Sequence, residues 1–114
     1  MVEYNFEENL NHIFHALADT TRRSLLEKIK TGPVRVTALA SHYPVSLNAI
    51  SKHIKVLEKA GLIKRNIEGR VHLCEANPEA LETAEEWIKK YTHFWNERLN
   101  NLEKYVMKKS KEKK

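Results

Sequence analysis

The sequence predicts a mainly α fold with a small β-hairpin. Apolar residues recur at intervals of three and four over most of the chain, and the glycines and prolines stand at the edges of those segments. This is the pattern of amphipathic helices. Only the stretch 62–75 departs from it, with short apolar runs on either side of Gly69, as expected for a hairpin. At 114 residues, 41% of them apolar, the chain has the material for one domain with an appended helix.

Two helices are expected first. Residues 7–17 place apolar side chains on one stripe of a helix, namely Leu10, Ile13, Phe14 and Leu17. A second helix follows Asp19, whose carboxylate is a suitable N-cap. Its inward-facing side chains are Leu25, Leu26 and Ile29. It ends at Gly32 and Pro33, because proline cannot continue a helix.

The segment 36–60 predicts two helices joined by a tight turn. The first is short and contains Val36, Leu39 and Ala40. The turn covers 43–45, and Ser46 is a good N-cap for the helix that follows. That second helix runs from about 47 to 60, and Gly61 closes it. Its buried stripe consists of Ile50, Ile54 and Leu57, spaced by three and four.

The opposite face of the second helix in this pair is polar. It carries Asn48, Ser51, Lys52 and Lys55. Such side chains suit a nucleic-acid groove, although most lysine-rich helix faces are simply solvated. The two strands of 62–75, joined at Gly69, would add a wing beside this helix pair. The sequence therefore predicts a winged helix-turn-helix.

The residues 78–107 predict one long helix, because no proline or glycine follows Pro78 in that range. Its apolar stripe, about 45 Å long at 1.5 Å per residue, consists of Leu81, Ala84, Ile88, Tyr91, Trp95, Leu99, Leu102 and Val106. A small domain cannot cover so long a stripe, so we expect a homodimer formed through the N- and C-terminal helices. The alternative is that the helix folds back on its own core. The expected interface residues are Leu10, Phe14, Ile88, Tyr91, Trp95, Leu99 and Leu102. Residues 1–107 would then form one domain, followed by a basic, disordered tail at 108–114.

Positive charge is concentrated in the middle of the chain. The net charge is +5, and residues 21–75 hold eleven Lys and Arg against four Asp and Glu. Residues 1–20, in contrast, hold four acidic residues and no basic one. This segregation favours a polyanionic partner for the central segment.

Several motifs together resemble the ArsR/SmtB-type winged helix-turn-helix regulators, over roughly residues 8 to 107. The first is Ala16-Leu17-Ala18-Asp19-x-Thr21-Arg22-Arg23 followed by Leu25-Leu26. The second is Val36-x-x-Leu39-Ala40. The third is Ile50-Ser51-Lys52-His53-Ile54-x-x-Leu57-x-x-Ala60-Gly61-Leu62-Ile63, with Glu68-Gly69-Arg70 similar to the family's wing. The sequence departs at Thr20, where this pattern usually has proline, which should cost some pre-organisation of the second helix.

The resemblance implies a cytoplasmic transcriptional repressor that binds double-stranded operator DNA, an inverted repeat, as a homodimer. It implies that Asn48, Ser51 and Lys52 face base edges or nearby phosphates, which agrees with the face that a helix-turn-helix presents to the major groove. The expected DNA-binding residues of the helix are Ser46, Leu47, Asn48, Ser51, Lys52, His53 and Lys55. Those expected in the wing are Lys64, Arg65 and Arg70.

Many members of that family sense metals, but the ligands for this are missing here. No cysteine lies between 35 and 40, and the last helix has one histidine, His93. Soft and borderline metals want three or four Cys or His ligands, so we expect no metal and no cofactor. The alternative is a metal-responsive repressor with an atypical site, for example at His12 and His15. The single cysteine, Cys74, allows no internal disulfide. The sequence does not specify a small-molecule or protein inducer.

Motifs of enzymes are absent from the sequence, which has no Gly-rich phosphate loop and no H-E-x-x-H string. No apolar run approaches the roughly 18 residues of a membrane helix. The rival function is a winged-helix protein-interaction module. Such a docking face would show aromatic or aliphatic anchors, and Leu47 is the one exposed-looking candidate on the polar helix face.

Overall fold

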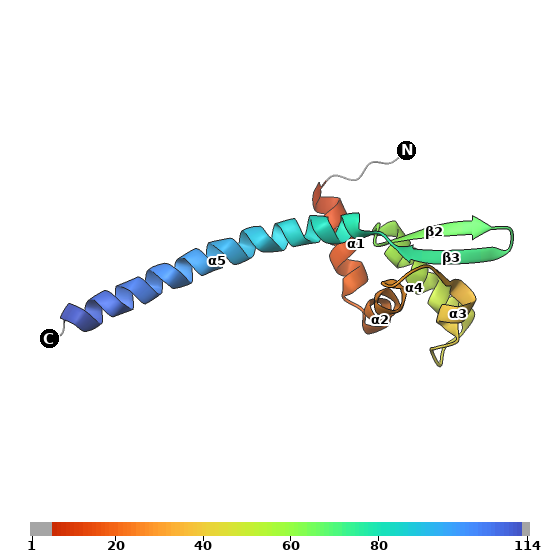
Figure 1. The fold of residues 1–114 in the computed structure, drawn as a ribbon, viewed down its shortest axis with the longest axis horizontal. Coiled ribbons are helices and arrows are strands. Elements are labelled where there is room, and N and C mark those ends of the chain that lie inside the picture. Colours follow the sequence, from red (N-terminus) through yellow and green to blue (C-terminus); the bar gives the residue numbers. More distant parts are fainter. Residues whose placement is uncertain (1–5, 113–114) are drawn as a thin grey trace. The chain divides into compact units, whose positions relative to one another are not determined.

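The computed structural model describes residues 6–112, which form five helices and three strands (Figure 1). The elements are α1 (Phe6–Leu17), α2 (Thr20–Ile29), β1 (Val34–Arg35), α3 (Val36–Ala40), α4 (Leu47–Lys59), β2 (Ile63–Glu68), β3 (Val71–Ala76) and α5 (Pro78–Glu112). The predicted mainly helical fold with a winged helix-turn-helix is confirmed. The chain divides into two compact units within α5, between Thr83 and Ala84.

The core of the first unit surrounds α4, which contacts α1, α2, α3 and β2. Its predicted stripe of Ile50, Ile54 and Leu57 is no more than 1% exposed. Fully burying side chains of this size is worth about 1.5–3 kcal/mol each. This burial fixes the rotation of α4, so its polar face must point away from the core.

Leu10 of α1 belongs to the same core and is only 3% exposed. It packs inside this single chain, and its expected place at a dimer interface stays a prediction. The spacing of apolar residues showed that Leu10 would be covered, but the spacing alone does not say by what. Phe14, on the same helix, is 37% exposed.

The corner between α1 and α2 is held by polar side chains. The Asp19 carboxylate accepts a hydrogen bond from the Arg22 amide at 3.0 Å, so it caps α2 as predicted. The Arg22 side chain points back and donates to the carbonyl oxygens of Ala16 at 2.8 Å and His15 at 3.0 Å. The last carbonyls of a helix lack partners within it and carry partial negative charge. A guanidinium placed there stabilises the end of α1.

The sheet is antiparallel, with strand order β1-β3-β2. The hairpin of β2 and β3 pairs Ile63 with Ala76 at one end and Glu68 with Val71 at the other. Gly69 opens its two-residue turn at φ +62°, as expected where a hairpin turn needs a positive φ. The expectation of a two-stranded wing was incomplete, because β1 adds a third strand. With only two residues, β1 is too short to show an alternating pattern in the sequence.

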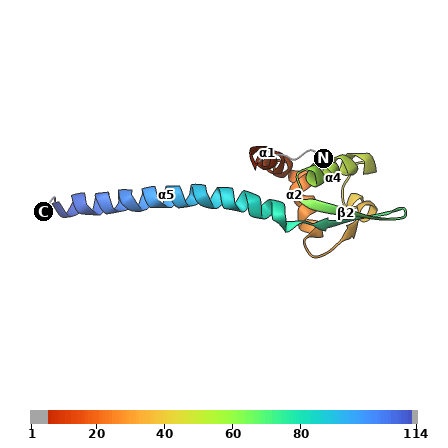
Figure 2. The ribbon, with the colours of Figure 1, turned by 90° about the horizontal axis from the view of Figure 1, so that it is seen from above.

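The helix α5 runs without a break from Pro78 to Glu112 (Figures 1 and 2). The prediction of a disordered tail is therefore wrong for residues 108–112, while 113–114 lie outside the described residues. Lysines near a helix C-terminus interact favourably with its dipole, and no residue of this stretch breaks a helix. No helix in the described range is long and apolar enough to cross a membrane.

Large apolar side chains of α5 are exposed in the second unit. They are between 40% and 58% exposed and comprise Trp87, Ile88, Tyr91, Phe94, Trp95, Leu99, Leu102, Tyr105, Val106 and Met107. The rings of Trp87 and Tyr91 stack with centroids 5.6 Å apart. The predicted stripe is thus present on the helix, and its side chains are half open to solvent within this single chain.

Candidate nucleic-acid interface

The helix α4 has well-defined ends. At its start, the Ser46 hydroxyl accepts a hydrogen bond from the Ala49 amide at 3.1 Å. At its end, Gly61 adopts φ +75° and its amide donates to the Glu58 carbonyl. The Leu62 amide donates to the carbonyl of Leu57, which completes a Schellman motif. Both ends are fixed by local hydrogen bonds, so the polar face between them belongs to a helix that is capped at each end.

The first three turns of α4 expose most of the predicted DNA-binding residues. Leu47 is 48% exposed, and Asn48, Lys52 and Lys55 are exposed as well. Within the described residues the side chains of these last three make no hydrogen bond or ion pair. Ser51 is half-buried. The face therefore carries donors and acceptors that the fold itself does not use.

His53 turns toward the corner between α1 and α2. Its Nδ1 lies 3.2 Å from Nη1 of Arg22 and 3.8 Å from Oδ2 of Asp19. The side chain is 26% exposed. The structure thus places His53 at the flank of α4, where its contacts join this helix to the α1–α2 corner.

In the wing, Lys64 and Arg70 are exposed, whereas Arg65 points inward. The Arg65 side chain is 15% exposed, and its Nη2 lies 3.5 Å from Oε1 of Glu58 on α4. Its Nη1 lies 3.4 Å from Nδ1 of His72 on β3. Arg65 therefore ties the wing to α4. Its Nε and Nη2 are buried and have no hydrogen-bond partner among the described residues.

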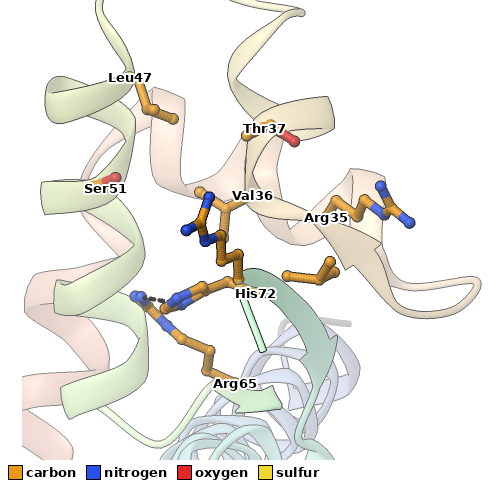
Figure 3. A pocket seen from close by; sticks show the side chains of 9 residues that line it. Arg35, Val36, Thr37, Leu47, Ser51, Arg65 and His72 are labelled. Atoms are coloured by element: carbon orange, nitrogen blue, oxygen red, sulfur yellow. Dashed lines mark hydrogen bonds between the residues drawn. The ribbon is translucent and has the colours of Figure 1, made fainter. Parts of the chain in front are cut away.

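A pocket of about 370 Å³ lies between α3, α4 and the wing. It is lined by Arg35, Val36, Thr37, Leu47, Ser51, Arg65, Arg70, Val71 and His72. Figure 3 shows Leu47 and Ser51 on α4 at one side of it and Val36 and Thr37 on α3 at another. We call this the α3–α4–wing pocket. Its lining includes three arginines, two residues with hydroxyl groups and the apolar side chains of Val36, Leu47 and Val71.

The pocket joins residues that the sequence placed in separate elements. Leu47, Ser51, Arg65 and Arg70 were all predicted to bind DNA, and each of them lines it. Sequence reasoning did not single out Arg35, Thr37 or His72. Arg35 and Thr37 flank the first residue of α3, so their position at the start of the helix-turn-helix was the signal available for them.

Cys74 lies in the core and is 0% exposed. Burial is the main cause that raises the pKa of its thiol, although the positive charge of Arg65 acts in the opposite direction. The thiol therefore stays protonated at neutral pH and packs as a small apolar group. Among residues 6–112, no group of three or more His, Cys, Asp or Glu side chains is placed to hold a metal ion.

Comparisons with known proteins agree on the class of this fold. Residues 17–66 match the sequence model of a helix-turn-helix domain family. The chain is 29% identical over 79 residues to the transcriptional repressor SdpR of Bacillus subtilis (strain 168), covering 69% of this chain and 88% of SdpR. It is 40% identical over 68 residues to the HTH-type transcriptional regulator Rv2034 of Mycobacterium tuberculosis (strain ATCC 25618 / H37Rv), covering 60% of this chain and 64% of that protein.

A solved structure matches over a longer stretch. The crystal structure of the ArsR family transcriptional regulator RHA00566 superimposes with a TM-score of 0.76 at 38% identity, over 84% of this chain and 97% of that one. The chain therefore belongs to the ArsR/SmtB-type family of winged helix-turn-helix transcriptional regulators.

Proposed function

We propose that this protein is a cytoplasmic repressor that binds an inverted-repeat operator as a homodimer. The exposed polar side chains on the first two turns of α4, next to the α3–α4–wing pocket, are the observation that carries the proposal. The helix N-terminal residues are the ones that a helix-turn-helix presents to base edges. The likeness to a protein named as a transcriptional repressor supports the direction of regulation.

The candidate residues fall into two groups, those that contact base edges and those that contact phosphates. Asn48 and Ser51 carry short groups that hydrogen-bond to base edges and so discriminate sequence. Lys52, Lys55 and Arg70 are exposed cations, and they attach the protein to phosphate without selecting sequence. Arg65 is a positioning residue, because its contact with Glu58 holds the wing against α4 and its contact with His72 joins the two strands of the wing.

The residues that line the pocket from α3 extend this surface. Thr37 is exposed at the first turn of α3, and Arg35 precedes it. We infer that they contact the sugar-phosphate backbone beside the groove that α4 enters. Together with Arg70, they would place cations and a hydroxyl on both sides of the bound strand.

A second copy of the chain completes the proposed function. Two recognition helices entering successive major grooves would lie about 34 Å apart. The exposed stripe of α5 provides the surface through which the second copy is held, and Ile88, Tyr91, Trp95, Leu99 and Leu102 remain the proposed interface residues. Phe14 of α1 has exposed surface to add to it.

Selection from a random-sequence DNA pool tests the function directly. Binding and amplification should enrich fragments that contain an inverted repeat with half-site centres about 10 base pairs apart. Failure to enrich any sequence would contradict the proposal and would favour the protein-interaction module instead.

Substitutions on α4 should separate base contacts from phosphate contacts. Lys52→Ala should weaken binding to operator and random duplexes alike and should reduce the magnitude of the salt slope by about 1. Asn48→Ala should lose about 1–3 kcal/mol on the operator alone, with little change of slope. Lys90→Ala, an exposed lysine of α5, is the control. Equal losses on both duplexes for Lys52→Ala and Asn48→Ala would contradict the base-contact assignment.

A further inference from the structure

The α3–α4–wing pocket combines positive charge with an apolar wall. Among the described residues that line it, three are arginines and none is acidic. Its apolar side chains come from α3, α4 and β3 and belong to Val36, Leu47 and Val71. Its volume of about 370 Å³ falls within the range of roughly 300–1,000 Å³ that small-molecule sites occupy. A DNA phosphate is wholly polar, so it would use the charge of this pocket and not its apolar wall.

Arg65 brings a largely buried positive charge to the pocket. Its side chain is 15% exposed, and its ion pair with Glu58 is long, at 3.5 Å. Its Nε and Nη2 are buried and have no hydrogen-bond partner among the described residues. Figure 3 shows the Arg65 guanidinium beside the imidazole of His72, next to α4. Since buried donors normally have acceptors, an acceptor from a ligand, met by a small movement of the guanidinium, would complete its hydrogen bonding.

We propose that the α3–α4–wing pocket binds a small organic acid, with the anionic head of the ligand on the arginines and its apolar body against the apolar wall. A guanidinium offers a planar set of donors that fits a carboxylate. Leu47 is 48% exposed, so a bound hydrocarbon chain would remove apolar surface from water, which is favourable. Neither a bare anion nor an uncharged hydrocarbon would use the whole lining.

An organic acid in this pocket would compete with DNA. The competition rests on the proposed function, in which Ser51 and Arg70 contact DNA, and both of these residues line the pocket. The bound acid would neutralise positive charge that attaches the protein to phosphate, and it would occupy the space between α4 and the wing. The ligand would therefore act as an inducer that releases DNA directly.

Binding is tested with octanoate, and octanol and acetate are the matched probes. Octanol keeps the apolar body without the charge, and acetate keeps the carboxylate without the body. In amide NMR spectra of the labelled full chain, octanoate should shift the signals of Thr37, Ser51 and Val71, and octanol and acetate should bind about tenfold more weakly. Acetate or inorganic phosphate that binds as well as octanoate would reduce the pocket to a subsite for DNA phosphate and overturn the proposal. Octanoate shifts confined to the exposed stripe of α5 would overturn it as well.

Two substitutions should weaken octanoate binding for different reasons. Arg70→Gln removes a charge at an exposed turn, so octanoate should bind about tenfold more weakly while octanol is unaffected. Val71→Phe fills the apolar side of the pocket and should also weaken octanoate. Ile67→Phe is the matched control, because Ile67 is 61% exposed and lies outside the lining. Octanoate affinity that is the same in all three variants would overturn the site.

Fluorescence anisotropy of a labelled random-sequence duplex separates this inference from the proposed function. At constant ionic strength, saturating octanoate should raise the apparent Kd of the unsubstituted chain for the duplex about tenfold, and acetate should not. The duplex affinity of Val71→Phe should not respond to octanoate. Octanoate that occupies the pocket without releasing the duplex would overturn the competition and leave DNA binding standing. A chain that binds no duplex even without octanoate would overturn the proposed function, whereas the NMR titration would still decide the ligand site.

Discussion

Asp19, Arg22 and His53 form a small cluster that fixes the direction of α4. Asp19 caps α2, Arg22 caps the carbonyl end of α1, and His53 joins both residues to the recognition helix. The motif that carried the family resemblance in this part of the sequence is therefore architectural. Its residues set the placement of α4, although Arg22 lies outside the proposed DNA-binding set.

The N-cap at Asp19 predicts a pH-dependent contribution to stability. The hydrogen bond from the Arg22 amide is the main cause that lowers the pKa of this carboxyl from its ordinary 3.8. Because the folded pKa is the lower one, the contribution is complete above pH 3.8 and is lost as pH falls through the lowered value. Asp19→Ala should therefore lower the Tm at pH 7 and change it much less near pH 2.

Asp19→Asn is the matched variant, because asparagine keeps a capping oxygen without the charge. It should lose less stability than Asp19→Ala at neutral pH. Thermal unfolding followed by circular dichroism measures both. A Tm difference between Asp19→Ala and the unsubstituted chain that is the same at both pH values would contradict this account.

At the scale of elements, the helices were predicted from the sequence, whereas the inward direction of one wing residue was missed although the sequence carried a signal for it. The stripe of Ile50, Ile54 and Leu57 and the caps at Asp19 and Ser46 depend on local spacing, which a sequence shows directly. The inward direction of Arg65 depends on the hairpin register, which pairs it with the buried Cys74. That register follows from the position of the turn at Gly69. Arg65 also shares a face with Ile63, two residues before it, so the alternation of strand side chains was a usable signal.

The two wing arginines should respond differently to truncation. Arg65→Ala removes a largely buried side chain and its contact with Glu58, so the unfolding free energy should fall by about 1 kcal/mol. In a unit of this size that corresponds to a Tm lowered by roughly 4–8 °C. Arg70→Ala, at an exposed turn, should change stability by less than about 0.5 kcal/mol but should weaken DNA binding and reduce its salt dependence.

Calorimetry and a DNA titration on the same two variants make the comparison. The assignment of Arg65 as a positioning residue would be wrong if Arg65→Ala kept the full Tm and lost affinity as Arg70→Ala does.

At the scale of the whole molecule, the sequence predicted a long apolar stripe but not the length of the helix that carries it. Lysine-rich ends are typical of disordered tails, and composition alone favoured one from 108 onward. The helix nevertheless continues to Glu112, because the preceding turns supply its hydrogen bonds and no glycine or proline intervenes. The α3–α4–wing pocket could not be predicted from the sequence either, because it depends on β3 lying beside α3.

A charged residue substituted into the α5 stripe should prevent the chain from forming a dimer without preventing it from folding. Leu102 is 57% exposed in the single chain, so Leu102→Glu should leave the helix and the first unit folded. In the proposed dimer it would bury an unpaired carboxylate, which is costly. Light scattering should therefore show a monomer, and affinity for an inverted repeat should fall much more than affinity for a single half-site. Asn100→Glu, on the opposite face, should remain a dimer. Dimeric Leu102→Glu protein would contradict the role of the stripe.

The two residues of β1 also have a consequence for recognition. They pair with Leu73 and Cys74 of β3, and the next residue begins α3. The wing and the helix-turn-helix are thus joined by main-chain pairing before any ligand arrives. In the proposed complex with DNA, little conformational entropy would therefore remain to be lost. The wing and the helix-turn-helix, held together in this way, have a fixed offset from each other. They would therefore favour duplexes whose local groove geometry already matches that offset, which makes DNA shape a second source of selectivity beside the bases.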